Sequence, residues 1–143
     1  MKKKVGIIAC SGEDLVGGTL TRAAARMVVE DLRPNNTIIL CQPLFMAGGL
    51  ERHGGQEERD FAKNHPTITI EGCEEECARI AVDQYSGSPA ATINVKKFID
   101  SHPELVPENP RRLGEKGLEL AKIIAEEIAQ KVDEFYGKKT KGS

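Results

Sequence analysis

Val5-Gly6-Ile7-Ile8-Ala9 is a short, continuously apolar stretch, and Cys10-Ser11-Gly12 follows it directly. A run of this length, rich in β-branched residues, is typical of a strand buried on both faces of a sheet. Similar runs occupy residues 37–40 and 67–70, and a weaker one covers residues 91–95. The chain is therefore expected to contain four strands.

Segments with helical periodicity separate these strands. Thr19 is the expected N-cap of a helix that runs to about Leu32. Two more helices are expected, at about residues 56–64 and 74–85. The glycine-bearing stretch 42–55 and the proline-rich stretch after residue 95 are predicted to be loops.

A long helix is expected near the C-terminus, from about Arg111 to Tyr136. One side of it is apolar, with residues spaced by three, four or seven positions: Leu113, Leu120, Ile124, Ile128, Val132 and Phe135. We expect this stripe to pack on the sheet of its own chain. Packing on a neighbouring subunit, which would give a homo-oligomer, is the alternative. Residues 138–143 are expected to form a flexible basic tail.

Strands and helices thus alternate in units of about thirty residues, which favours βαβ connections and a mainly parallel sheet. The predicted fold is a three-layer α/β fold of the Rossmann or flavodoxin-like type, with a long C-terminal helix. A chain of 143 residues is the length of one ordinary domain. We therefore expect a single domain over residues 1–137.

Composition excludes several classes of partner. The chain has 22 acidic and 20 basic residues, and this balance does not fit a dedicated nucleic-acid binder. The apolar run after the N-terminal lysines is shorter than the roughly 7–15 residues of a secretory signal. No window approaches the roughly 18 apolar residues of a membrane span. We expect a cytoplasmic protein that binds neither nucleic acid nor membrane.

The four cysteines are the most informative feature of the composition. In a reducing compartment they indicate metal binding or thiol chemistry, not a disulfide framework. Cys10, Cys41 and Cys73 lie 31 and 32 positions apart, and each follows a predicted strand. Ligands bind at the carboxyl ends of parallel strands, so these three thiols are expected to converge there.

Cys77 comes four residues after Cys73, a gap that is common in zinc sites. The four cysteines together predict one metal site, with zinc as the expected ion and sensing or delivery as its purpose. Four thiolates would close a structural site, and three would leave a position open for water or substrate.

Other readings of the same cysteines stay open. The chain fits a redox or sulfur-transfer enzyme, in which Cys10 attacks and Cys41 or Cys77 resolves. An iron–sulfur protein is a weaker alternative, since the spacing matches neither ferredoxin pattern. Buried, chemically silent cysteines in a scaffold that assembles through its C-terminal helix are the remaining alternative.

Acidic residues surround Cys73 and favour the metal reading. Glu71 and residues 74–76 are all glutamates. Negative neighbours raise the pKa of a thiol and oppose a reactive thiolate, whereas a bound cation gains from the same field. Acids in a first helical turn also suit the helix dipole, which is sufficient as a structural explanation.

Known catalytic arrangements find little support. Cys10 stands on a strand–loop–helix like the nucleophile of small tyrosine phosphatases, but Val16 occupies the position of their anion-binding arginine. Gly17-Gly18-Thr19 does not match a nucleotide-binding P-loop, and tight-turn glycines explain it better. His53 lies in the glycine-rich loop, as a supplementary ligand, a proton shuttle or, more commonly, a solvated loop residue.

These motifs resemble the DGC-domain family of zinc-binding proteins, which is named for an Asp-Gly-Cys motif. The resemblance covers about residues 4–100 and has Glu71 at the position of the aspartate. The matching segments are Cys10-Ser11-Gly12 with Gly17, Cys41 with Gly48-Gly49, and Glu71-Gly72-Cys73 with Cys77-Ala78. The resemblance implies four metal-chelating cysteines, Cys10, Cys41, Cys73 and Cys77, and no particular reaction.

Overall fold

The computed structural model describes residues 3–46 and 55–136. Its four strands form one parallel sheet in the order β2-β1-β3-β4. The strands are β1 (Val5–Ala9), β2 (Thr37–Leu40), β3 (Thr67–Glu71) and β4 (Ala91–Asn94). All four lie where the sequence predicts strands, because continuous apolar and β-branched runs are typical of parallel sheets. The prediction that residues 37–40 form a buried strand like the others was wrong, because β2 lies at the edge of the sheet and exposes Ile38 and Ile39.

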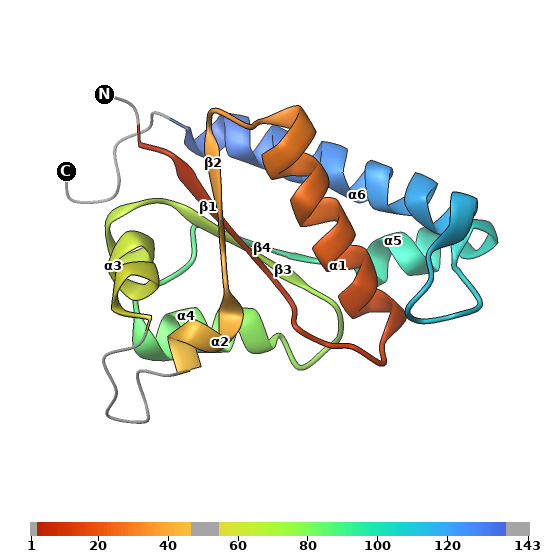
Figure 1. Ribbon diagram of the computed structural model, residues 1–143, viewed down its shortest axis with the longest axis horizontal. Coiled ribbons are helices and arrows are strands. Elements are labelled where there is room, and N and C mark those ends of the chain that lie inside the picture. Colours follow the sequence, from red (N-terminus) through yellow and green to blue (C-terminus); the bar gives the residue numbers. More distant parts are fainter. Residues whose placement is uncertain (1–2, 47–54, 137–143) are drawn as a thin grey trace.

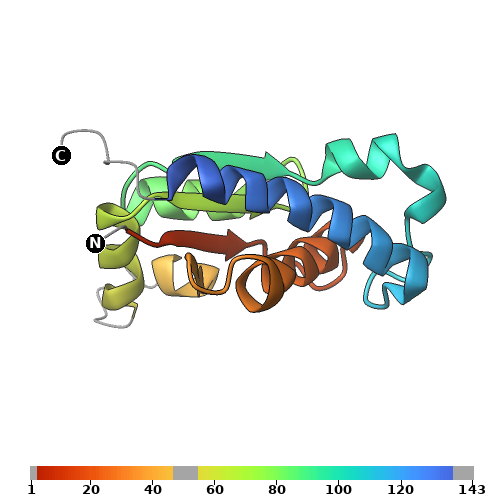
Figure 2. The same cartoon turned by 90° about the horizontal axis from the view of Figure 1, so that it is seen from above.

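Helices cover both faces of the sheet, so the predicted three-layer α/β fold is confirmed. Figures 1 and 2 show α1 and α6 on one face, with α2, α3 and α4 on the other. The helical segments are α1 (Val16–Met27), the π-helical η1 (Val28–Leu32), α2 (Gln42–Met46), α3 (Gln56–Asn64), α4 (Cys77–Tyr85), α5 (Lys96–Ser101), the 3-10 segment η3 (Pro103–Leu105) and α6 (Gly114–Phe135).

The central strand β1 contributes to two separate cores. Val5 and Ile7 pack with α1 and α6, whereas Ile8 packs with Leu40 and Phe45 on the side of α4. Successive side chains of a strand point to opposite faces, so an uninterrupted apolar run serves both layers. The described part of the chain therefore has a hydrophobic core on each face of the sheet.

The apolar stripe of α6 packs within its own chain, as predicted. Leu120, Ile124, Ile128 and Val132 are fully buried in the core shared with α1 and the sheet. Leu118, on the opposite side of the helix, is 50% exposed. Assembly through α6 stays a prediction, and residues 138–143 lie outside the described part of the chain.

The first helix differs from its prediction. It begins at Val16, after Leu15, and not at Thr19. Thr19 lies inside the helix, and its hydroxyl donates to the carbonyl oxygen of Pro110 at 2.5 Å. The expectation of a tight turn at Gly17-Gly18 was wrong, because both glycines are helical and buried.

Three further boundaries were predicted wrongly. Residues 42–46 form α2, whose first turn tolerates Pro43 because a helix start needs no N–H there. The fourth helix begins at Cys77, so residues 74–76 precede it. The proline-rich stretch contains α5 and η3. Short helices such as these lack the several turns from which periodicity can be recognised.

No helix within residues 3–46 and 55–136 is long and apolar enough to cross a membrane.

An ion pair between Arg33 and Asp133 joins the end of η1 to α6, with two N–O distances of 2.7 Å. The hydrogen bond from Arg33 holds the pKa of Asp133 below its ordinary value. The pair therefore stabilises the fold above the unfolded-state pKa of this carboxyl, and the effect disappears as pH falls through the folded-state pKa.

We expect Asp133→Asn to lower the free energy of unfolding by about 0.5 kcal/mol at neutral pH, since the pair is half exposed and screened by solvent. Urea denaturation at several pH values measures this loss. The matched control is Asp31→Asn at an exposed position. An equal loss in both variants, or a loss that persists at acid pH, would contradict the assignment.

Candidate metal centre

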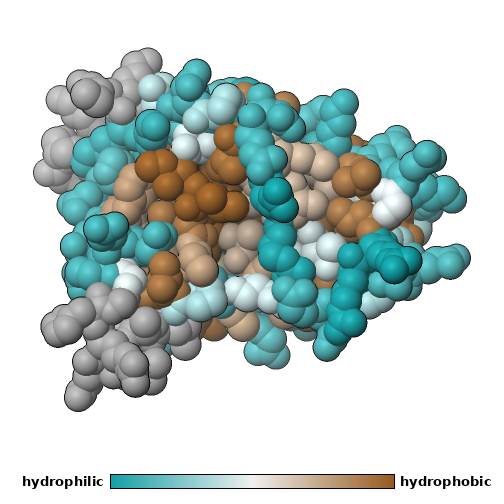
Figure 3. All heavy atoms as spheres, viewed as in Figure 1, coloured by the Kyte–Doolittle hydropathy of each residue, from teal (hydrophilic) through white to brown (hydrophobic). Residues whose placement is uncertain are grey.

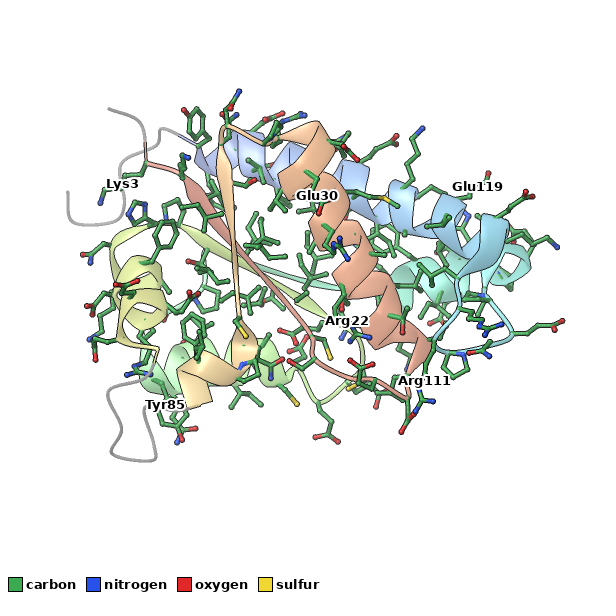
Figure 4. All side chains as sticks on the ribbon, viewed as in Figure 1. Lys3, Arg22, Glu30, Tyr85, Arg111 and Glu119 are labelled. Carbon is green, nitrogen blue, oxygen red and sulfur yellow. The ribbon has the colours of Figure 1, made fainter. Side chains whose placement is uncertain are left out.

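The sheet order places β1 between β2 and β3, so Cys10, Cys41 and Cys73 follow three adjacent parallel strands. The strand ends meet at one edge of the molecule, and Figure 4 shows sulfur atoms along that edge. All four cysteines are free thiols. The structure thus brings the predicted thiols to one side of the fold.

Cys10 is the most enclosed of the four, with 7% of its surface exposed. Its own N–H donates to the carbonyl of Ile70 at 3.0 Å and continues the pairing of β1 with β3. The N–H of Gly12 donates to the Cys10 sulfur at 3.4 Å. This contact holds the sulfur against the backbone of its own loop.

Arg22 of α1 holds the loop that carries Cys10. Its Nη1 atom donates to the carbonyl oxygens of Cys10, at 3.3 Å, and of Gly12. Thr21 adds a hydroxyl bond of 3.4 Å to the Cys10 carbonyl. Figure 4 shows Arg22 at this edge of the molecule. Sequence reasoning missed Arg22, because no spacing motif marks a residue that acts on carbonyl oxygens through a fold contact.

Four glycines bring the Cys10 loop against the Cys73 loop. A Cβ atom at Gly17 would stand 1.9 Å from the carbonyl oxygen of Gly72, and one at Gly72 would stand 2.6 Å from the nitrogen of Gly18. A Cβ atom at Gly18 would stand 2.3 Å from the Gly12 carbonyl oxygen. The two loops therefore touch backbone to backbone, which a side chain at these positions would prevent.

The chain turns sharply between Cys73 and Cys77. Glu76 has φ 51° and ψ 49°, and it is the one residue other than glycine with positive φ in the described ranges 3–46 and 55–136. This left-handed conformation is uncommon for a residue with a side chain and is often found at functional sites. An ion pair of 3.0 Å with Arg79 holds Glu76 in place.

Glu71 at the end of β3 is fully buried and caps α4. Its two carboxylate oxygens accept the N–H groups of Ala78 at 3.2 Å and Arg79 at 2.8 Å. Burial raises the pKa of Glu71, and these two hydrogen bonds partly offset the rise. The sequence grouped Glu71 with the acids around Cys73, but its carboxylate anchors the helix that begins at Cys77. The sequence feature that could have indicated this role is a charged residue at the end of an apolar strand.

Cys41 begins the connection from β2 to α2, and its side chain is exposed. Its N–H donates to the Glu58 carboxylate at 3.3 Å. The next residue, Gln42, accepts two bonds of 3.1 Å from the backbone N–H and hydroxyl of Ser11. These bonds tie the Cys41 segment to the loop that carries Cys10.

The electrostatic field at this edge is negative around Cys77. Partial burial raises the pKa of the Cys77 thiol, and the neighbouring Cys73, Cys10, Glu71 and Glu75 raise it further. Cys10 and Cys73 therefore lie close enough to Cys77 to contribute to this rise. This field disfavours a thiolate nucleophile at Cys77 and favours a bound cation.

The thiols are not assembled into a coordination shell. Across residues 3–46 and 55–136, no group of three or more histidine, cysteine, aspartate or glutamate side chains stands close enough to hold a metal ion. Cys41 and Cys77 are exposed, so their side chains have room to rotate. His53 and the glycine pair 48–49 lie outside the described residues.

A shallow depression of about 350 Å³ opens beside Cys73. It gives solvent and small molecules access to this thiol. The surrounding residues are Gly72, Cys73, Glu74, Glu75, Lys96 and Ile99.

Together these features define a three-layer α/β protein with four free thiols at the carboxyl edge of its parallel sheet. The family model of the DGC domain matches residues 6–110, which is well over half of the chain. The chain therefore belongs to the DGC-domain family. The match ends before α6, which agrees with the extent of the resemblance in the sequence. No curated protein and no solved structure matches the chain.

Proposed function

We propose that this protein binds a thiophilic divalent metal, with zinc as the expected ion, through Cys10, Cys41, Cys73 and Cys77. The observation that carries the proposal is the position of Cys10, Cys41 and Cys73 after three adjacent parallel strands, with Cys77 at the start of α4 beside Cys10 and Cys73. Thiolate sulfur is a preferred ligand of Zn²⁺.

The four thiols are chemically suitable ligands for zinc. Their side chains would have to move before all four could reach one ion. Backbone contacts at Gly17 and Gly72 hold two of the loops in place, whereas the exposed side chains of Cys41 and Cys77 are free to turn. Coordination would then crosslink the ends of β1, β2 and β3. Zinc supplies no redox chemistry here.

A metal that exchanges, as in sensing or delivery, fits the carboxyl edge of the sheet better than a permanently bound structural metal. Structural zinc sites commonly provide the folding energy of domains that lack a core. This chain has two hydrophobic cores, and two of its four thiols face solvent. An incoming thiol or chelator would therefore reach the metal while the protein stayed folded.

Metal content and thiol accessibility test the proposal. Anaerobically purified, untagged protein is expected to carry about one zinc per chain with its thiols masked. Each Cys→Ser variant should lose more than about 100-fold in zinc affinity, since changes outside the coordination shell already cost 10–100-fold. Competition with a chromophoric chelator measures this. Ser88→Ala, remote from the four thiols in sequence, is the control and should bind as the natural chain does.

Zinc affinity is also expected to rise with pH. The pKa of Cys77 lies above its ordinary value, so this thiol holds its proton at neutral pH and must release it to bind metal. Chelator competition at several pH values should show affinity increasing through the alkaline range. An affinity independent of pH would count against Cys77 as a ligand.

A thiol enzyme of the redox or sulfur-transfer type is the second candidate. The hydrogen bond from Gly12 favours it, because this bond orients the Cys10 sulfur in the loop between β1 and α1. Metal-free protein with one fast-reacting thiol would replace the zinc proposal by this one. A brown, iron-containing sample would instead indicate an iron–sulfur cluster, and metal-free protein with four slow thiols would indicate a scaffold.

A further inference from the structure

The outer side of β2 offers hydrogen-bonding groups to a partner strand. In the sheet order, β2 is an edge strand that pairs with β1 alone. The N–H of Val5 donates to the carbonyl of Asn36, and Val5 is in register with Thr37. By the alternation of a parallel ladder, Ile38 directs its backbone groups to β1, whereas Thr37 and Ile39 direct theirs outward.

The same edge exposes large apolar side chains on both faces of the sheet. Ile38 is 37% exposed and Ile39 is 46% exposed, on opposite sides of the strand. Figure 3 views the molecule from this edge and shows a hydrophobic patch over β2. Proteins commonly protect an edge strand with charged side chains, proline or a bulge, and β2 has a regular four-residue ladder without charge or proline.

The chain segment that contains β2 is also uncharged, although the Glu58 carboxylate of α3 accepts the N–H of Cys41 just beyond the strand. Residues 34–46 contain no acidic or basic side chain, although 29% of the residues in the whole chain are charged. Two copies meeting at this edge would therefore bring no like charges together along the strands. Cys41 and Pro43 beyond the strand are exposed and neutral as well.

We propose that β2 pairs antiparallel with β2 of a second copy of this chain, about a two-fold axis at Ile38. Thr37 of one copy would then exchange both backbone hydrogen bonds with Ile39 of the other, and the reverse. The two Ile38 residues would face each other as a non-hydrogen-bonded pair, in which Cα atoms are about 4.5 Å apart. An isologous contact of this kind closes on itself, and it joins the two sheets into one.

The occupant is a second copy because the exposed edge is self-complementary in both respects on which pairing depends. Thr37 and Ile39 lie symmetrically about Ile38, so one rotation satisfies the outward groups of both copies. The two Ile38 side chains likewise face each other, whereas each Ile39 lies opposite Thr37 of the other copy and diagonal to the other Ile39. This interface is distinct from assembly through α6, where the exposed apolar residue is Leu118.

Sedimentation velocity over a hundredfold range of protein concentration tests the proposal. Chelator and reductant are included so that metal bridges and disulfides between thiols do not contribute. The natural chain is expected to shift from monomer to dimer with concentration. Ile38→Lys and Ile39→Lys should each weaken the dimer at least about tenfold: the first places two like charges directly opposite each other, and the second places them diagonally and removes an apolar side chain from the interface. The matched control Leu118→Lys should leave it unchanged.

Thermal melting by circular dichroism checks that each lysine variant folds. If one variant does not fold, the other still tests the proposal. The register has its own test: Ile38→Cys should crosslink between copies under mild oxidation, because the expected Cα separation falls in the range of disulfides. Leu118→Cys should not, with linked peptides identified by mass spectrometry. Any of three results would overturn the proposal: the natural chain stays monomeric, the dimer persists in both isoleucine variants, or Leu118→Lys abolishes the dimer.

Discussion

Gly17→Ala is expected to destabilise this protein by about 3 kcal/mol or more. The added methyl group would lie 1.9 Å from the carbonyl oxygen of Gly72, and the nearest atoms all belong to backbone. No rotation of a side chain relieves such a contact, so α1 and the loop after β3 would have to separate. Because these segments carry the neighbours of Cys10 and Cys73, zinc affinity should fall together with stability.

Urea denaturation gives the free energy of unfolding, and chelator competition gives the metal affinity. Gly87→Ala is the matched control: the nearest atom to a Cβ there is 3.7 Å away, which is ordinary contact. That variant is expected within about 0.5 kcal/mol of the natural chain. If Gly17→Ala were equally mild, the two loops would not be in the contact described.

Glu71→Gln is expected to cost about 1–3 kcal/mol of folding stability. The carboxylate accepts one N–H from Ala78 and one from Arg79 with different oxygens. Glutamine has a single acceptor oxygen, so one buried N–H would face an amide donor. Glu71→Ala should cost more, since it leaves both N–H groups unpaired and opens a cavity.

A second glutamine variant distinguishes the capping role of Glu71 from an effect of acidic charge on the thiols. Glu75→Gln makes the same chemical change at an exposed neighbour of Cys73 and is expected to leave stability unchanged. Loss of the cap should loosen α4 at Cys77, which amide hydrogen exchange of Ala78 and Arg79 would report directly. Equal stability of the two variants would show that Glu71 does not anchor α4.

The pH dependence of Glu71 has a definite sign. Burial raises the pKa of this carboxyl in the folded state, so the folded state binds its proton more tightly than the unfolded state. The corresponding stability is complete below the unfolded-state pKa and is lost as pH rises through the folded-state value. The stability gap between the natural chain and Glu71→Gln should therefore narrow as pH rises through that interval.

Some elements were predictable because their signals are local. The stripe of α6 repeats a helical period over 22 residues, and the continuously apolar run Val5–Ala9 is typical of a buried strand; both elements lie where the sequence predicts them. Helix α2 has five residues, too few for a period to appear. Gly17 and Gly18 suggested a turn, whereas the reason for these glycines is a contact with Gly12 and Gly72 in other loops.

Sequence alone determined the α/β class and placed Cys10, Cys41 and Cys73 at strand ends, because hydrophobic period and turn chemistry act between near neighbours. Tertiary structure decided how those thiols are held. Glu71 accepts an N–H group of α4 from Ala78, seven positions further along the chain, Arg22 reaches back across its loop, and β2 becomes an edge through the strand order. These features depend on contacts between distant segments, which no local pattern encodes.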